Sequence, residues 1–313
     1  MSNPFHPELR ASARWLRLLP PIRVIKVLDR VHARRPVPAP PRLADVDVRD
    51  LSFAARDGQS LRLRLYRPAA RAQETPLLLW IHGGGLVIGS PEQDEASNLS
   101  IVRKLGIAVA AVRYRLAPEW PFPTPLEDGY SALSFLHAQA EALGLARSRI
   151  AVGGASAGGG LAAALTQLAH DRGELPIAFQ LLIYPMLDDR SAMRADIDRS
   201  QLRMWSQRDN VYGWSAYLGH APGQPELRPY AVPARRAAFE GLPPAWLGVG
   251  SCDLFHDEGV AYAAQLTAAG VACELHVVPG AYHAFDLAAR AAVVRTFRAS
   301  YLAALQRALY DAT

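Results

Sequence analysis

Short, almost wholly apolar runs recur along the chain, with room for one helix between most of them. They lie at 77–81, 107–112, 150–152, 179–183, 245–249 and 275–278. Strands of a parallel sheet are covered on both faces and show this character. Helical patterns fill most of the intervals, for example at 126–143, 161–169, 259–269 and 287–309. The alternation predicts an α/β fold, a mostly parallel sheet with helices on both faces.

Three segments depart from this alternation. Residues 60–66 alternate Leu with polar residues, which predicts a half-exposed antiparallel strand near a sheet edge. The Pro-rich stretch 35–42 separates a basic, helical N-terminus from the rest. Residues 184–245 form a connection far longer than an ordinary βα loop, with an aromatic-rich helical pattern at 204–219. We expect this insertion to pack over the carboxyl edge of the sheet, together with the N-terminal helices.

Composition and charge narrow the class of protein. The chain has 313 residues, of which 50% are hydrophobic and 20% charged, as in a globular protein, and this excludes disordered, fibrous and disulfide-stapled chains. The net charge of +5 is concentrated in residues 1–45. That basic stretch is either a solvated helix face or a peripheral contact with anionic lipid. The chain has no Lys/Arg stripe with interleaved aromatics of the kind that binds nucleic acid. It also has no apolar run long enough for a membrane span.

Two cysteines, Cys252 and Cys273, stand alone and make neither a metal-ligand spacing nor a disulfide framework. Cys273 begins the strand that follows Cys252, at the opposite end of a parallel pair, so no disulfide is expected between them. We expect a soluble, cytoplasmic protein without a metal.

A nucleophile motif follows the strand at 150–152. Gly154-Ala155-Ser156-Ala157-Gly158 fits G-x-S-x-G, and an Ala-rich helix comes next. In this motif the serine lies on a strained strand-to-helix turn, where larger side chains at the two glycines would clash with backbone. The overlapping match to G-x-G-x-x-A at 158–163 lies inside the helix instead of in the turn, so a dinucleotide site is not expected.

Three glycines follow the strand at 77–81, in the sequence His82-Gly83-Gly84-Gly85. Backbone amides of such a loop can hold the oxyanion of a tetrahedral intermediate, together with the amide of the residue after the nucleophile. A merely flexible loop would not explain its place at the end of a strand upstream of G-x-S-x-G.

A nucleophilic serine needs a base, and the base needs an orienting acid. Of nine histidines, His283 follows a strand and so lies at the carboxyl edge, where Ser156 also lies. Asp253 follows the preceding strand and lies between the two in the order of this motif class. Asp257 and Glu258 are rival acids, but they fall where a helix begins and are interpreted as first-turn acids favoured by its dipole.

Six features, in this order, resemble the hormone-sensitive-lipase-like branch of α/β-hydrolases. They are HGGG at 82–85, YRLAPE at 114–119, PFPTPLED at 121–128, GASAGG at 154–159, YPMLDD at 184–189, and the pair Asp253 and His283-x-Phe285. The resemblance spans nearly the whole chain from about residue 45. It implies an eight-stranded, mostly parallel sheet with a helical cap, and hydrolysis of carboxylic esters without a cofactor.

The resemblance also assigns roles to six residues. It implies Ser156 as nucleophile, Asp253 as acid, His283 as base, and Gly83, Gly84 and Ala157 as oxyanion donors. Whether Gly85 also donates stays open. Relatives usually carry Asp or Thr before the nucleophile, and this chain has Ala155, so fine positioning or pH behaviour is expected to differ.

The resulting prediction is a serine carboxylesterase for short- to medium-chain acyl esters. The alternatives are a non-catalytic binding protein on the same fold, or an amidase, lactonase or acyltransferase. The predicted division is an N-terminal part of the cap at 1–44, a catalytic core at 45–187 and 231–313, and a cap insertion at 188–230. Met204 and four aromatic residues of the insertion either line a pocket or pack as core; the aromatic residues are Trp205, Tyr212, Trp214 and Tyr217.

Overall fold

The computed structural model describes residues 3–16, 20–32, 37–70 and 74–311. Within these residues a single eight-stranded sheet runs in the order β1-β2-β4-β3-β5-β6-β7-β8. The strands are β1 Val46–Ala54, β2 Ser60–Pro68, β3 Thr75–Ile81, β4 Ala108–Arg113, β5 Leu145–Ala155, β6 Phe179–Ile183, β7 Ala245–Gly250 and β8 Cys273–Val278. The β1–β2 and β2–β4 pairs are antiparallel, and the other five pairs are parallel. The mostly parallel sheet expected from the sequence is confirmed.

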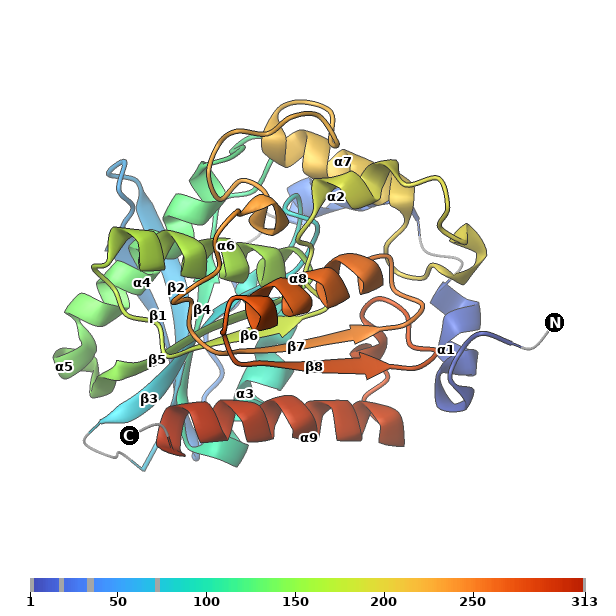
Figure 1. The fold of residues 1–313 in the computed structure, drawn as a ribbon. Coiled ribbons are helices and arrows are strands. Elements are labelled where there is room, and N and C mark those ends of the chain that lie inside the picture. The colour runs from blue at the N-terminus through green and yellow to red at the C-terminus, as the bar shows by residue number, and fades with distance from the viewer. Residues whose placement is uncertain (1–2, 17–19, 33–36, 71–73, 312–313) are drawn as a thin grey trace.

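Helices cover both faces of this sheet (Figure 1). They are α1 Arg10–Trp15, α2 Ile22–His32, α3 Glu95–Leu105, α4 Thr124–Ala138, α5 Ala140–Leu143, α6 Ala157–Arg172, α7 Gln207–Leu218, α8 His256–Ala268 and α9 Ala292–Gln306. Helices α4, α6 and α8 lie on one face, and α3 and α9 on the other. Every residue of β3, β6 and β7 is buried, which is why these strands are almost wholly apolar.

Four features differ from the sequence prediction. Strand β1 was not predicted, because its sequence VDVRDLSFA mixes charges with apolar residues as an edge strand does. Helix α3 was not predicted either, since EASNLSIVRKL has a weak apolar face. The helix predicted at 126–143 is two helices, with Gln139 between them.

The fourth difference concerns the antiparallel strand β2, which is less exposed than its alternation indicated. The side chain of Arg64 is only 2% exposed, because carboxylates from neighbouring elements cover it. Asp50 on β1 lies 2.7 Å from Arg64, and Glu95 on α3 lies 3.3 Å away. The alternation of Leu and Arg in the sequence therefore predicts an exposed side chain at position 64, whereas ion pairs bury it.

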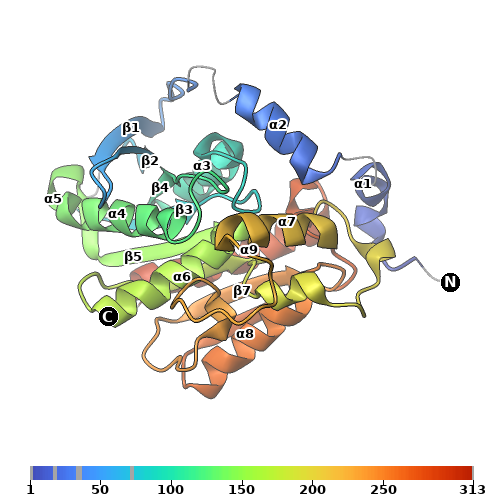
Figure 2. The ribbon, with the colours of Figure 1, turned by 90° about the horizontal axis from the view of Figure 1, so that it is seen from above.

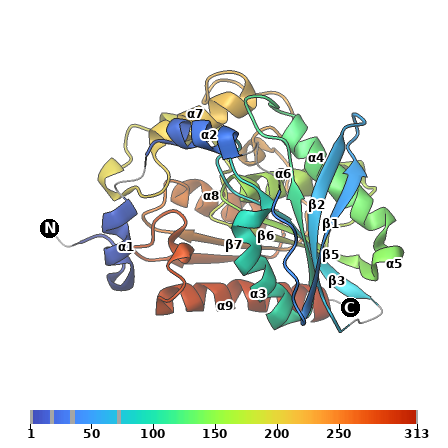
Figure 3. The same cartoon turned by 180° about the vertical axis from the view of Figure 1, so that it is seen from behind.

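The N-terminal helices lie outside the layered core. Helix α2 contacts α7 (Figures 2 and 3), and α1 lies past the carboxyl ends of β7 and β8 (Figure 1). The backbone amide of Ile22 donates to Asp209 of α7 at 3.0 Å, and Arg203 donates to the Ala13 carbonyl at 2.7 Å. The His6 amide donates to the Gly280 carbonyl after β8 at 2.9 Å. The N-terminus thus connects the 184–245 segment to the loop after β8. The first two residues of the Pro-rich 35–42 stretch lie outside the described part.

In the described part of the chain no helix combines the length and the apolar character that crossing a bilayer requires. Cys252 and Cys273 are both free thiols, as the sequence indicated.

Candidate active site

Ser156 lies on the turn between β5 and α6, with φ 57° and ψ −122°. This backbone conformation is unfavourable for a residue with a side chain, so the surrounding contacts must hold it. The Ser156 amide donates to the Ile183 carbonyl at 2.9 Å. A Cβ atom added to Gly154 would lie 2.4 Å from the Gly158 carbonyl oxygen, and one added to Gly158 would lie 2.0 Å from the Ile81 oxygen. The predicted steric need for both glycines is confirmed.

The side chains of Ser156, His283 and Asp253 form a continuous hydrogen-bonded row. His283 Nε2 lies 2.8 Å from Ser156 Oγ, and His283 Nδ1 lies 2.8 Å from Asp253 Oδ2. Asp253 Oδ1 accepts a second hydrogen bond from the Phe255 amide at 2.9 Å. All three side chains are buried. A carboxylate only accepts, so the Nδ1 proton points at Asp253 and Nε2 is left to accept the serine proton.

Two aromatic rings hold the imidazole of His283 from the sides. The Tyr184 ring lies edge-on at 4.9 Å and the Phe255 ring edge-on at 5.0 Å. Tyr184 has φ 34°, and its hydroxyl donates to Asp286 at 2.7 Å. The sequence alone does not assign a role in the site to Tyr184 or Asp286. Tyr184 lies in the YPMLDD motif, which could have indicated its role. No motif marks Asp286.

The glycine loop after β3 lies directly against the nucleophile turn. A Cβ atom on Gly83 would lie 2.9 Å from the Ala155 carbonyl oxygen and 3.4 Å from Ser156 Cβ. Gly84 has φ 121° and Gly85 has φ 60°, conformations that favour glycine. The structure therefore brings Gly83 next to Ser156, Gly84 follows Gly83 in the loop, and Ala157 is the first residue of α6. The methyl group of Ala155 offers no hydrogen bond beside them.

The side chain of His82 holds the start of this loop in place. Its Nδ1 lies 2.8 Å from the Gly83 carbonyl oxygen, and its ring stacks on Tyr114 at 4.3 Å. Burial lowers the pKa of His82 to about 4, so the ring is neutral at physiological pH. A neutral ring with its proton on Nδ1 donates to the carbonyl and holds the first turn of the loop.

A family model described as the alpha/beta hydrolase fold matches residues 78–287, which include the glycine loop, the nucleophile turn, Asp253 and His283. The chain belongs to the α/β-hydrolase fold family. Its curated relatives include an ethyl acetate hydrolase of Pseudomonas putida, 38% identical over 76% of this chain and 75% of the relative. The carboxylesterase NlhH of Mycobacterium tuberculosis is 36% identical over 79% of this chain and 78% of the relative. These relatives are carboxylic ester hydrolases.

Solved structures agree with this family. A bacterial heroin esterase superposes on this α/β-hydrolase with a TM-score of 0.87 at 39% identity, and the match covers 98% of each chain. The family membership and the fold implied by the sequence motifs are both confirmed.

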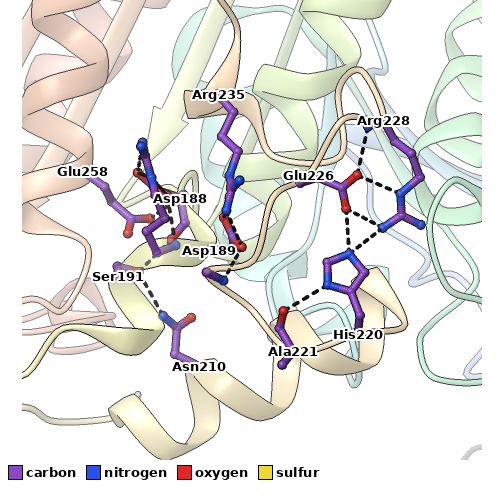
Figure 4. Close-up of polar contacts among 12 residues, drawn as sticks. Asp188, Asp189, Ser191, Asn210, His220, Ala221, Glu226, Arg228, Arg235 and Glu258 are labelled. Atoms are coloured by element: carbon purple, nitrogen blue, oxygen red, sulfur yellow. Dashed lines mark hydrogen bonds and ion pairs between the residues drawn. The ribbon is translucent and has the colours of Figure 1, made fainter.

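In this α/β-hydrolase, Trp205 and α7 pack on the outer side of the glycine loop. A Cβ atom on Gly85 would lie 2.0 Å from the Trp205 indole, and one on Gly213 would lie 2.8 Å from the Gly85 carbonyl oxygen. The indole donates to Asn210 at 3.2 Å. Asn210 in turn donates to Ser191 at 3.0 Å (Figure 4). The indole of Trp205 is therefore held in place beside the glycine loop. Trp214 and Tyr217 are buried against each other as core.

The second acid of the YPMLDD motif is a structural anchor. Asp189 is fully buried, receives two hydrogen bonds at 2.9 Å from Arg235, and accepts one from the Gly223 amide at 2.6 Å (Figure 4). These three positions lie far apart within the 184–245 segment. Asp189 thus fixes the path of that segment over the core.

The rival acids Asp257 and Glu258 both lie in the first turn of α8, as predicted, and neither contacts His283 in the described structure. Asp257 is exposed and pairs with Arg194. Glu258 is buried, and burial raises its pKa to about 8, so most of this carboxyl is protonated at neutral pH and carries no charge for the helix dipole to stabilise. Its Oε1 accepts from the Leu187 amide at 2.7 Å, and its Oε2 has no hydrogen-bond partner among the described residues. No sequence signal marks this burial.

The raised pKa of Glu258 makes the free energy of unfolding depend on pH. Its folded pKa of about 8 lies above the ordinary value of 4.5, so the folded state holds a proton that the unfolded state has lost between these values. Stability therefore falls as pH rises through that window. We expect wild type to lose about 3 kcal/mol between about pH 5 and about pH 8 that Glu258→Gln does not lose. Urea unfolding at both pH values measures this.

The matched control for this experiment is Glu240→Gln, at an exposed carboxylate. It should follow the wild-type pH dependence. Equal slopes in wild type and Glu258→Gln would show that Glu258 is ionised in the folded protein, contrary to this prediction.

Proposed function

We propose that the protein is a serine carboxylesterase that hydrolyses short- to medium-chain acyl esters. The observation that carries the proposal is the row of two 2.8 Å contacts joining Ser156, His283 and Asp253, beside the glycine loop at 83–85. The names of the relatives, an ethyl acetate hydrolase and a heroin esterase among them, support a small ester as substrate.

The proposed acylation step begins with attack of Ser156 Oγ on the ester carbonyl carbon. His283 Nε2 takes the hydroxyl proton as the new C–O bond forms, and Asp253 stabilises the resulting imidazolium. The carbonyl electron pair moves onto oxygen, which the amides of Gly83, Gly84 and Ala157 hold. Collapse of this intermediate breaks the bond to the alcohol oxygen, which leaves with the proton from His283.

The proposed deacylation step repeats this chemistry with water. His283 takes a proton from a water molecule, whose oxygen attacks the acyl-enzyme carbonyl. The tetrahedral intermediate rests on the same amides. Its collapse releases the carboxylic acid and returns the proton to Ser156 Oγ, so the enzyme is regenerated without a cofactor.

Hydrolysis of p-nitrophenyl esters from acetate to palmitate tests the reaction and the chain length together. Ser156 is only 8% exposed, and Trp205 packs on the loop beside it, so long acyl chains should fit poorly. We expect kcat/KM for the butyrate ester to exceed that for the palmitate ester by at least about tenfold, since each misplaced methylene costs ~1 kcal/mol or more.

Three results would contradict this proposal. Faster turnover of palmitate than of butyrate would assign a lipase-like site. Faster turnover of p-nitroacetanilide than of p-nitrophenyl acetate would assign an amidase. No turnover of any ester by folded protein would favour a binding protein.

We also propose that residues 1–44 and 188–230 form a cap over the catalytic core at 45–187 and 231–313. The packing of α2 on α7 and of Trp205 and Gly213 on Gly85 supports this division. The cytoplasmic location stays a prediction.

A further inference from the structure

Helix α2 has a sharply two-sided sequence. With 3.6 residues per turn, positions 24 and 27 fall along one side, and both carry Val. Positions 22 and 26 fall on the opposite side, and Arg and Lys occupy positions 23, 26 and 30. An amphipathic helix on a globular protein ordinarily turns its apolar side inward.

In this protein α2 turns Ile22, Ile25 and Lys26 toward the core and leaves two valines exposed on its other side. Ile22 and Lys26 face the protein and are 6% and 5% exposed. Lys26 Nζ donates to the Ala117 carbonyl at 3.3 Å and pairs with Glu119 at 3.1 Å, so a charge anchors the inner side. Val24 and Val27, on the apolar side, are 49% and 59% exposed. In Figure 2 no other element lies beyond α2 on its outer side.

A large aromatic side chain on α1 is also exposed. Trp15 is 74% exposed, and α1 and α2 both lie at the same margin of the molecule in Figure 2. Tryptophan is favoured at the boundary between lipid headgroups and acyl chains, because its ring is apolar and its N–H is polar. Three exposed apolar side chains therefore stand on the two N-terminal helices.

Arginines accompany these apolar side chains. Arg14 and Arg23 are exposed on α1 and α2, and Arg23 also lies over the Tyr212 ring. Arg199 and Arg208, both exposed, border a depression of about 330 Å³ that is lined by Pro20 and Pro21 from the link between α1 and α2.

Three nearby carboxylates hold contacts with other groups, and Asp198 accepts from the Ser200 amide at 3.0 Å and from the Gln201 side chain at 2.7 Å. Asp209 accepts from the Ile22 amide at 3.0 Å and from the Ser206 hydroxyl at 2.6 Å, and Glu119 pairs with Lys26 at 3.1 Å. The outer surface therefore presents apolar side chains among cations. We call it the α1–α2 face and define it by Trp15, Val24, Val27, Arg14, Arg23, Arg199 and Arg208.

We propose that the α1–α2 face binds an anionic phospholipid bilayer. Trp15, Val24 and Val27 lie in the boundary between headgroups and acyl chains, and the arginines lie at the lipid phosphates. Charge decides between this partner and a second copy of the chain. A symmetric dimer through this face would bring its cations against the same cations of the partner, whereas an anionic bilayer neutralises them. The inference does not depend on the proposed esterase reaction.

Co-sedimentation with lipid vesicles tests this proposal. Wild type is mixed with vesicles of phosphatidylcholine plus phosphatidylglycerol, and with vesicles of phosphatidylcholine alone. We expect binding to the anionic vesicles that weakens with added salt. Arg14→Ser and Arg23→Ser should each lower the partition coefficient about fivefold. Val24→Asp with Val27→Asp should lower it at least about tenfold, because two apolar contacts become anions.

Matched controls lie outside the α1–α2 face. Arg307→Ser removes one exposed cation beyond α9, and Leu275→Asp replaces a 38% exposed apolar residue on the edge strand β8. Both should bind vesicles as wild type does. Circular dichroism melting checks the fold of every variant without relying on activity.

Two results would overturn the inference. One is absence of binding to anionic vesicles, or binding that the Val24 and Val27 substitutions leave unchanged. The other is a wild-type dimer, seen by light scattering, that the same substitutions convert to a monomer, since a second copy would then occupy this face.

Discussion

Replacing Ser156 by alanine is expected to lower kcat for a short p-nitrophenyl ester by roughly 10⁴- to 10⁶-fold. The substitution removes the oxygen that lies 2.8 Å from His283 Nε2 and leaves no other nucleophile in the row. Amides of the glycine loop could still polarise a carbonyl, which is why some activity over background is expected to remain. Steady-state kinetics with purified protein measures the loss.

The fold should survive this substitution, because alanine keeps the Cβ atom and the turn. The matched control is Ser134→Ala, at an exposed serine of α4, which should keep wild-type kinetics. Ordinary turnover by Ser156→Ala, with an unchanged melting curve, would refute the assignment of Ser156 as nucleophile.

Asp253→Asn is expected to lower kcat by about 10⁴-fold with little change in KM. The Asp253 carboxylate accepts from His283 Nδ1 at 2.8 Å and so keeps Nε2 free to take the serine proton. An amide in its place donates to Nδ1, and the imidazole proton then moves to Nε2. A ring protonated there cannot act as the base, although its position hardly changes.

Asp257→Asn serves as the matched control for this prediction. Asp257 is the same residue type, four positions along the chain, but its side chain is 56% exposed and pairs with Arg194. Its substitution should leave kcat within about a factor of two, as for a surface charge away from the site. Loss of activity in Asp257→Asn with retention in Asp253→Asn would exchange the two roles and contradict this account.

The layered fold follows from the sequence because its strands are buried on both faces. The runs at 77–81 and 179–183 have no polar face, so their burial leaves few other arrangements. Strand β1 and helix α3 escaped prediction because their charges pair with other elements, as Asp50 and Glu95 do around Arg64. A pattern read along the chain cannot show which distant charge will cover a residue.

The candidate site likewise contains some residues that the sequence predicts and others that it does not. Ser156, His283 and Asp253 could be selected because each follows a strand and the carboxyl ends of parallel strands meet. The burial of Glu258 beside the Leu187 amide and the edge contact of Tyr184 with His283 depend on packing across the sheet edge. The contact of Trp205 with Gly85 joins residues about 120 positions apart, and no local spacing encodes it.

Covalent labelling tests most directly whether Ser156 is the nucleophile. Diethyl p-nitrophenyl phosphate transfers its diethyl phosphoryl group to an activated serine oxygen and releases p-nitrophenolate. We expect a single adduct per chain, located on Ser156 by peptide mass spectrometry, with loss of ester hydrolysis and no adduct in Ser156→Ala. An adduct on another residue, or full activity of chains labelled at Ser156, would contradict this assignment.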